Sequence, residues 1–369
     1  MKIKLSIVLA IVVFVLSMPF IFNKSVTVQK PHKLDVDGNF ILNEWVPSRD
    51  GEGPDWNYNL KPVQVSDRVW CFFGAMEMPT QHNAGDMSNS CYIKGDTAWI
   101  AWDSGPSYKF AEQAYAQMKK IKDMPVSNVV VSHEHDDHWL GNNYYKEVHG
   151  AEIIGPESIN VNYYGPREIE GVKYPGMQTR MIKALYQDAI RKTKLVKVDK
   201  AFEHTTKFKL SGINMEYVRV GYAHSEDDWF LYLPEDKVVL VGDVVMNGRI
   251  TSNRDGLIIG QLNALKAIKA RDWNHLVPGH GFITDNTGAD EAVQYFTYIK
   301  DRVLAGIEEE IDPDDITKHV TLEEFRNKDL YYLLSPGNVF RAYEELEMYE
   351  GDDDEDDEDE DDDEDEEKE

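Results

Sequence analysis

The stretch "VVVSHEHDDHWLGN", residues 129–142, places six titratable side chains in a row directly after an apolar run. A short run of β-branched residues is typical of a buried strand. His133 and His135 are two positions apart, which suits the end of an extended strand, and Asp137 and His138 follow where a turn or helix begins. Imidazole and carboxylate groups together are ligands for zinc, iron or manganese. The stretch therefore predicts a metal site at the end of a strand.

Three later apolar runs also end in a potential metal ligand. They are "MEYVRVGYAHS", which ends near His224, "DKVVLVGDVV", which ends near Asp243, and "HLVPGHG", which ends at His280. In open α/β sheets, ligands bind just beyond the strand ends. We therefore expect these side chains to meet those of the first stretch.

The order of these motifs resembles the metallo-β-lactamase fold superfamily. "HEHDDH" fits its H-x-H-x-D-H signature, and "WDSG" with Asp103, "GYAHSEDD", "LVGDVV" and "VPGHG" occur in the order of that family. The resemblance covers about residues 63–285. It implies an α/β fold, a four-layer αββα sandwich of two mixed sheets.

The resemblance also implies a ligand set for two divalent metal ions, zinc first, with iron or manganese as alternatives. Asp243 would bridge the two ions, and Asp137 and Asp243 would be the catalytic carboxylates. Asp103 would orient a ligand, and Glu134 and Asp136 would face the structure or solvent. The implied ligands are His133, His135 and His224 for one ion and Asp137, His138 and His280 for the other.

The implied activity is that of a dinuclear metal-dependent hydrolase, in which a metal-bridging hydroxide cleaves an ester, lactone, thioester or lactam bond. Aspartate at position 243 is typical of hydroxyacylglutathione hydrolases and lactonases, whereas several true β-lactamases have cysteine or serine there. One alternative is a mononuclear non-haem iron oxidoreductase resembling persulfide dioxygenases, which needs fewer ligands. A binding or docking protein is a third interpretation, and the intact ligand set argues against it.

The two ends of the chain have biased sequences. Lys2 and Lys4 precede an apolar run, so residues 1–22 are predicted to be a signal peptide or membrane anchor, with the rest exported to the periplasm or exterior and possible anchoring to the inner membrane. Residues 351–369 are acidic except for Gly351 and Lys368 and predict a disordered tail. The formal net charge of −28 disfavours nucleic-acid partners and leaves a small-molecule substrate as the expected partner.

Between these ends we expect an irregular extension over 23–62, a catalytic domain over 63–310 and C-terminal helices over 311–350. Helices are predicted near 110–123, 178–192, 260–270 and 289–310, and Thr321 with Glu324 predicts the capped start of another. An insertion over 156–200 is placed where a substrate lid would lie.

Several side chains carry weaker signals. Cys71 and Cys91 lie in strand-like stretches, and the sequence leaves open whether they pair or remain two buried thiols. Candidates for substrate contact, each with packing or a solvated face as the simpler interpretation, are His82, Tyr163, Tyr164, Tyr174, Arg180, Lys183 and Arg191.

Overall fold

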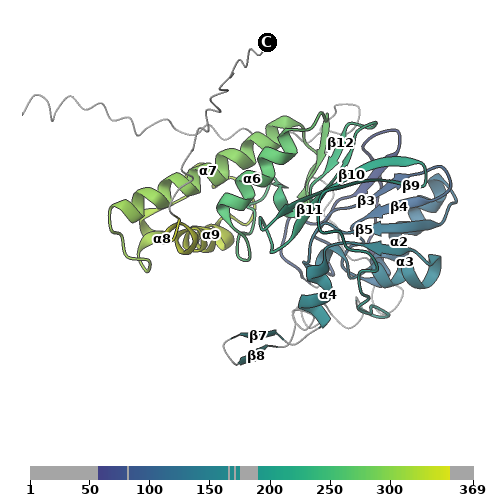
Figure 1. The fold of residues 1–369 in the computed structure, drawn as a ribbon, viewed down its shortest axis with the longest axis horizontal. Helices are drawn as coiled ribbons and strands as arrows, with labels where there is room; N and C mark the ends of the chain where they lie inside the picture. Colours follow the sequence, from purple (N-terminus) through teal and green to yellow (C-terminus); the bar gives the residue numbers. More distant parts are fainter. Residues whose placement is uncertain (1–56, 81–82, 165–166, 170–171, 175–189, 350–369) are drawn as a thin grey trace, which may run out of the picture.

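The computed structural model describes residues 57–80, 83–164, 167–169, 172–174 and 190–349, and Figure 1 shows their arrangement. The predicted signal or anchor, the acidic tail, His82 and most of the helix predicted over 178–192 lie outside the described residues. No helix within the described ranges is both long and apolar enough to span a bilayer.

The first sheet has six strands in the order β1-β2-β3-β4-β5-β6. Its first four strands are antiparallel, and β4, β5 and β6 are parallel, so the sheet is mixed. The strands are β1 (Val63–Gln64), β2 (Val69–Phe72), β3 (Ser90–Lys94), β4 (Trp99–Trp102), β5 (Val126–Val130) and β6 (Glu152–Ile154).

The second sheet has five strands in the order β14-β12-β11-β10-β9. Only the β12–β14 pair is parallel, so this sheet is also mixed. The strands are β9 (Thr206–Leu210), β10 (Ile213–Gly221), β11 (Asp228–Leu233), β12 (Val238–Leu240) and β14 (His275–Val277). Two short pairs stand apart from both sheets, β13 (Met246–Asn247) with β15 (His280–Gly281), and β7 (Arg167–Ile169) with β8 (Val172–Tyr174).

Alternating side chains of these strands build the layers. In β4, Ile100 and Trp102 point into the core between the two sheets, while Trp99 and Ala101 point into the core beneath helices α2 and α3. The alternation follows from the two-residue period of a strand, which sends neighbouring side chains to opposite faces. Both faces of the first sheet are therefore buried, which is why the sequences of its strands are nearly continuous apolar runs.

Helices cover the outer face of each sheet, as Figure 1 shows. α2 (Tyr108–Ile121) and α3 (Asn142–His149) pack on the first sheet, and α6 (Ile258–Lys269) and α7 (Asn286–Glu308) pack on the second. α4 (Glu157–Tyr164) lies at the open end of the sandwich. The predicted four-layer αββα architecture with two mixed sheets is confirmed.

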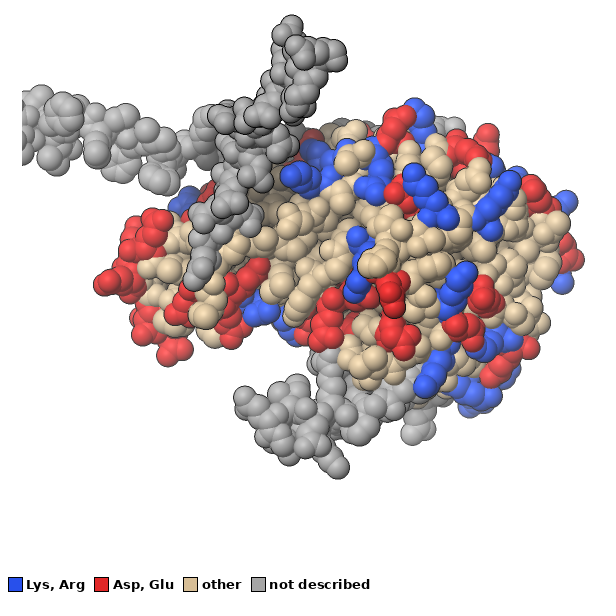
Figure 2. All heavy atoms as spheres, viewed as in Figure 1, with Lys and Arg blue, Asp and Glu red and all other residues tan. Residues whose placement is uncertain are grey.

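The C-terminal segment packs against α6 and α7. It contains α8 (Ile316–His319), a 3₁₀ turn η4 (Glu323–Phe325) and α9 (Tyr331–Leu346). The predicted helix start at Thr321 is wrong, because only the short η4 forms there and no side chain caps it. Figure 2 shows acidic side chains gathered at the far end of α7 and α8, where Glu308, Glu309, Glu310, Asp312 and Asp314 are exposed.

The two cysteines form a disulfide between neighbouring strands. Cys71 of β2 and Cys91 of β3 are direct cross-strand partners, and both side chains are fully buried between the two sheets. The bond answers the question that the sequence left open. Cys91 directly follows residues 87–90, a segment that contacts the candidate site described below.

Removing the disulfide should weaken the fold and leave the candidate site intact. The two cysteines are 20 residues apart in the sequence, and closing a loop of that size removes chain entropy from the unfolded state, worth about 3 kcal/mol. We expect the Cys71→Ala/Cys91→Ala double variant to lose about that much unfolding free energy in urea denaturation. An unchanged denaturation midpoint at an unchanged slope would contradict the prediction.

Candidate metal centre

The candidate ligands lie on turns that follow strands of both sheets. β5 continues through Val131 and Ser132 to His133, and the 3₁₀ turn η2 (Asp136–His138) comes next. The phenol of Tyr217 in β10 donates a hydrogen bond to the carbonyl of Val131 at 2.6 Å, and the amide of Trp229 in β11 donates to the carbonyl of Ser132 at 2.9 Å. The second sheet thus fixes the end of the first at the point where the ligands begin.

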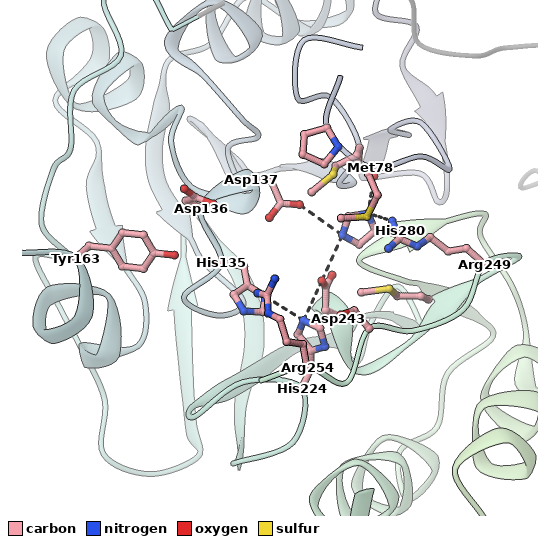
Figure 3. A pocket seen from close by; sticks show the side chains of 14 residues that line it. Met78, His135, Asp136, Asp137, Tyr163, His224, Asp243, Arg249, Arg254 and His280 are labelled. Atoms are coloured by element: carbon pink, nitrogen blue, oxygen red, sulfur yellow. Dashed lines mark hydrogen bonds and ion pairs between the residues drawn. The ribbon is translucent and has the colours of Figure 1, made fainter. Parts of the chain in front are cut away.

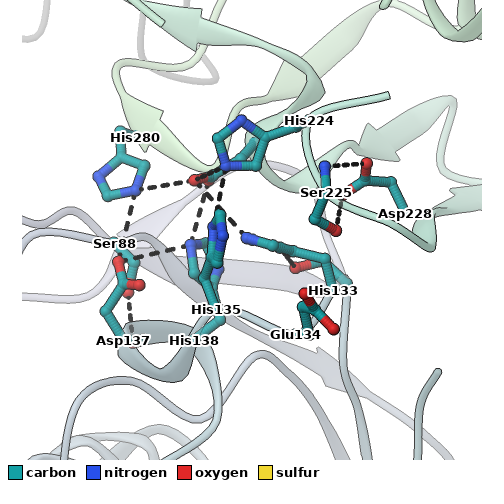
Figure 4. A network of polar contacts seen from close by, with 12 residues as sticks. Ser88, His133, Glu134, His135, Asp137, His138, His224, Ser225, Asp228 and His280 are labelled. Atoms are coloured by element: carbon teal, nitrogen blue, oxygen red, sulfur yellow. Dashed lines mark hydrogen bonds and ion pairs between the residues drawn. The ribbon is translucent and has the colours of Figure 1, made fainter. Parts of the chain in front are cut away.

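The other candidate ligands come after strands of the second sheet. His224 follows β10, Asp243 lies in the 3₁₀ turn η3 (Gly242–Val244) after β12, and His280 opens β15. Close packing at this turn requires glycine, since a Cβ at Gly279 would lie 1.9 Å from Oδ1 of Asp243. The strand ends converge as the sequence predicts, and Figure 4 shows their side chains facing one another.

Within the described residues, these side chains form two groups. In each group the potential ligand atoms lie within 4.8 Å of one another. All of the residues are buried except His135, which is partly exposed. The first group contains His133, His135, His224 and Asp243, and the second contains Asp137, His138 and His280. The structure therefore brings together all seven side chains that the sequence assigned to two metal ions.

Asp243 lies between the two groups. Its Oδ2 is 3.2 Å from Nε2 of His224 and 3.7 Å from Nε2 of His133, both in the first group. The same carboxylate reaches the second group, with Oδ2 3.2 Å from Nε2 of His280 and Oδ1 3.1 Å from Nε2 of His138. Its carboxylate can thus contact two cations at once.

Several buried polar atoms of the candidate ligands have no hydrogen-bond partner, which shows whether the site fits cations. Nε2 of His133, Nε2 of His138, Oδ2 of Asp137 and Oδ1 of Asp243 are buried and have no hydrogen-bond partner. Leaving such atoms unsatisfied is costly unless something else binds them. Nδ1 of His135 lies 3.0 Å from Nε2 of His224, so one cation can bind both ring nitrogens. The atoms that face the centre therefore fit metal ions.

The opposite ring nitrogens are held by other groups. Nδ1 of His138 lies 2.8 Å from Oδ2 of Asp103, and Nδ1 of His280 donates to the carbonyl of Met87 at 2.6 Å. Nδ1 of His133 lies 2.8 Å from Oγ of Ser132. A hydrogen bond at the outer nitrogen leaves the inner nitrogen free to bind a metal ion.

The local charges match this assignment. Burial raises the pKa of Asp243, but the histidines around it outweigh burial and hold that pKa well below its ordinary value. Burial, together with the charge of His138, lowers the pKa of His133 well below its ordinary value, so its ring is neutral. Burial opposes the charge of His138, but Asp243, Asp137 and Asp103 raise its pKa well above the ordinary value. A cation must displace that proton, so metal affinity should rise with pH.

The other predicted residues have mixed outcomes. Asp103 contacts His138 as predicted, with φ of +49°. Glu134 is buried, and its carboxylate accepts a hydrogen bond from Asn162 of α4 instead of joining either group. Asp136 lines the pocket beside the groups. Tyr163 also lines the pocket while packing on Trp139 with ring centroids 4.8 Å apart.

The remaining weaker candidates cannot be placed at the site. His82, Arg180 and Lys183 lie outside the described residues, as do the side chains of Tyr164 and Tyr174. Arg191 is exposed and does not line the pocket.

Sequence reasoning missed part of the pocket wall. Figure 3 shows the pocket, in which Arg249 and Arg254 join the candidate ligands. The polar stretch "GRITSNRD", residues 248–255, follows "LVGDVVMN" and was a usable signal, because loops after strand ends form binding sites in this kind of fold. The missed lining residues are Met78, Pro79, Met87, Met246, Arg249, Ser252 and Arg254.

Comparisons with known proteins agree with the fold. A family model described as "Metallo-beta-lactamase superfamily" matches residues 83–280. No curated protein matches the chain. The sec-alkylsulfatase Pisa1 from Pseudomonas sp. is similar in structure, with a TM-score of 0.57 and 16% identity over 80% of this chain and 52% of that one. A double mutant of the same sulfatase gives a TM-score of 0.59 and 15% identity over the same shares of the two chains.

A metallo-beta-lactamase from Pontibacter korlensis gives a TM-score of 0.49 and 19% identity, over 65% of this chain and 99% of that one. The chain spans about half the length of the alkylsulfatase chains that it matches. At these identities the solved structures show the fold alone.

Proposed function

The chain belongs to the metallo-beta-lactamase superfamily, and from that premise we propose that it is a dinuclear metal-dependent hydrolase of a small molecule. The bond cleaved is an ester, lactone, thioester or lactam. The observation that carries the proposal is the position of Asp243, whose carboxylate lies within 3.2 Å of ring nitrogens from both histidine groups. A carboxylate shared in this way fits two neighbouring cations.

Each cation would be held by its own set of residues, and one residue would be shared. His133, His135 and His224 would hold one cation, Asp137, His138 and His280 the other, and Asp243 both. Two divalent cations held there would lower the pKa of bound water and polarise a substrate carbonyl. Asp103 keeps the hydrogen of His138 on Nδ1, and the carbonyl of Met87 does the same for His280.

The pocket determines how a substrate would approach. Met78, Met87, Met246 and Tyr163 line the pocket together with Asp137 and Asp243 and supply its apolar surface. Methionine side chains adapt to ligands of different shape. In Figure 3 the carboxylates of Asp137 and Asp243 and the rings of His224 and His280 face one another in this pocket. A small substrate with an apolar body would therefore place its scissile bond over the candidate ligands.

A mononuclear oxidoreductase is the weaker proposal. Such a site needs one group of ligands, and the polar side chains of the second group would then be buried at a cost in free energy with no cation bound to them. Asp137, His138 and His280 are all buried, and Asp103 orients one of them. A maintained second group favours two metal ions over one.

Export to an oxidising compartment is also a proposal. The disulfide between Cys71 and Cys91 supports it, because disulfides persist outside the reducing cytosol.

We expect about two divalent metal ions per chain and hydrolysis of at least one class in a screen of esters, lactones, thioesters and lactams. Sulfate esters join the screen because Pisa1 is a sec-alkylsulfatase. Metal content by mass spectrometry is measured on the sample that is assayed. One tightly bound iron per chain with oxygen consumption on persulfide substrates would instead establish the oxidoreductase.

A further inference from the structure

Arg249 is a buried cation in the wall of the pocket. Its side chain lies next to His280, with Nη1 3.5 Å from the ring Nδ1, and only 3% of the residue is exposed. In the described part of the chain, the guanidinium forms no ion pair with a carboxylate, and its one hydrogen bond to an acceptor is a long one of 3.4 Å to the carbonyl of Ile250. Figure 3 shows this side chain turned towards His280 and the pocket.

Buried charges in proteins are normally paired. The acids whose charges act on Arg249 are Asp243, Asp137 and Asp329. Asp329 is exposed and forms no ion pair with the guanidinium, whereas Asp243 and Asp137 are candidate ligands of the cations. With cations bound, those carboxylates are already neutralised. The planar, five-donor guanidinium of Arg249 is then left to bind an anion that enters the pocket.

Arg254 makes a useful comparison. It lines the same pocket, but its guanidinium is paired with Asp255 and its side chain is more than half exposed. Only Arg249 therefore combines burial, a place in the pocket wall and an unpaired charge among the described arginines that line it.

The C-terminal segment fixes the loop that carries these residues, over 248–255. Asp329 pairs with the loop on both sides of Arg249, since its amide donates to the carbonyl of Gly248 at 3.1 Å and its carbonyl accepts from the amide of Ile250 at 2.9 Å. This bridge sets the direction in which the Arg249 side chain leaves the backbone.

Asn338 of α9 holds the loop on both sides of Ser252. Its Nδ2 donates to the carbonyl of Thr251 at 2.6 Å, and its Oδ1 accepts from the amide of Asn253 at 2.9 Å. The same Nδ2 also donates to the hydroxyl of Tyr295 at 2.7 Å, which ties the amide to α7. Asn338 is buried, and all of these contacts are within the protein interior.

A third contact lies just beyond the loop. The carboxylate of Glu345 accepts hydrogen bonds from the amides of Ile258 and Ile259, at 2.5 and 3.0 Å, and so caps the first turn of α6. Two points of the C-terminal segment thus hold the loop itself, and a third holds the start of α6 just beyond it.

We propose that residues 248–255 form a recognition loop in which Arg249 binds an anionic oxygen group of the substrate, and that Asn338 is the positioning residue that holds this loop from α9. The inference rests on the proposed function, because it assigns a substrate class to the same site: an apolar body that carries a carboxylate, sulfate or phosphate group. The methionine-lined wall receives the body, and Arg249 receives the anion.

Calorimetric binding to the metal-loaded full chain tests the anion site without hydrolysis. The probes are benzoate, phenyl sulfate and phenyl phosphate, which differ in the anion, and benzamide, which is neutral. In Arg249→Gln, we expect the preferred anion to bind at least about 10-fold more weakly, with benzamide unchanged, because a charge-assisted bidentate contact is lost. Arg249→Lys should recover part of the affinity. Arg271→Gln, at an arginine paired with Glu216, should change neither.

Equal binding of anions and benzamide to the native chain, or undiminished anion binding in Arg249→Gln, would overturn the inference. Arg249-dependent anion binding without hydrolysis in the substrate screen would instead overturn the proposed function and leave the anion site standing. Hydrolysis that does not depend on Arg249 would overturn the anion site and leave the proposed function standing.

The positioning role has a separate readout. Asn338→Ala should lower affinity for the preferred anion by about 5-fold, the value of about one hydrogen bond, while metal content and benzamide binding stay the same. Asn338→Asp keeps the acceptor for Asn253 and loses the amide hydrogens, so it tests the same contact if the alanine variant does not fold. Ser335→Ala, at a buried polar residue of the same helix with no hydrogen bond, is the matched control. A lowered melting temperature with unchanged anion preference would overturn the positioning role.

Discussion

In the Asp243→Asn variant, we expect one bound metal ion per chain instead of two, and loss of most activity at neutral pH. The substitution keeps the shape of the side chain and removes the negative charge that lies between the two groups. Two cations would then repel each other more strongly across the site. Both groups lose the shared carboxylate, and each keeps three side chains. The second ion must also displace the proton that Asp137 and Asp103 favour on His138, so we expect it to be lost first.

The expected fall in kcat/KM is about 10³-fold at pH 7, because one of two cations that activate water is missing. A single cation lowers the pKa of water less, so part of the activity should return at alkaline pH. Metal content and a pH–rate profile are measured together. Asp236→Asn, which breaks a pairing with Arg68 away from the pocket, serves as the control and should retain two ions. Two tightly held ions with an unchanged profile in Asp243→Asn would rule out a bridging role.

The sequence was sufficient to locate the candidate ligands because each follows a short apolar strand. A run such as "NVVV" before His133 is buried on both faces, so its end lies at the edge of the sandwich. His224, Asp243 and His280 follow the same rule on the other sheet. Local sequence patterns were therefore sufficient to predict both the fold class and the place where the strand ends converge.

The recognition loop and its support could not be read in this way. Arg249 and Asn338 are 89 positions apart, and their relationship depends on how α9 packs on α6 and α7. The helix start predicted at Thr321 was wrong, because only η4 forms there, and α9 begins at Tyr331 and continues through Pro336 and Gly337, which normally interrupt a helix. Tertiary packing outweighs these local preferences, and no local pattern records it.

Asp103 belongs to neither group of candidate ligands. Its carboxylate is buried and accepts hydrogen bonds from the amide and hydroxyl of Ser132 at 2.8 and 2.9 Å and from Nδ1 of His138 at 2.8 Å. The residue has φ of +49°, a conformation that asparagine tolerates better than most residues. Asp103→Asn should therefore preserve the backbone and change only the hydrogen-bond pattern.

In that variant, an amide NH₂ group faces Nδ1 of His138 where a carboxylate oxygen stood. The ring nitrogen must then accept a hydrogen bond, which moves the ring hydrogen to Nε2 and removes the lone pair that faces Asp243 and Asp137. We expect affinity for the second ion to fall by about 10- to 100-fold, the usual cost of losing an orienting group, while the ion held by His133, His135 and His224 stays. Zinc titration calorimetry on the metal-free chain should resolve the two sites.

Ser90→Ala is the matched control, because it removes only the hydrogen bond to the Asp103 carbonyl. It should lower stability by about 1 kcal/mol and leave both affinities unchanged. If Asp103→Asn binds both ions as tightly as the native chain, then His138 does not depend on Asp103 for its tautomer, and its assignment to the second ion loses its main structural support.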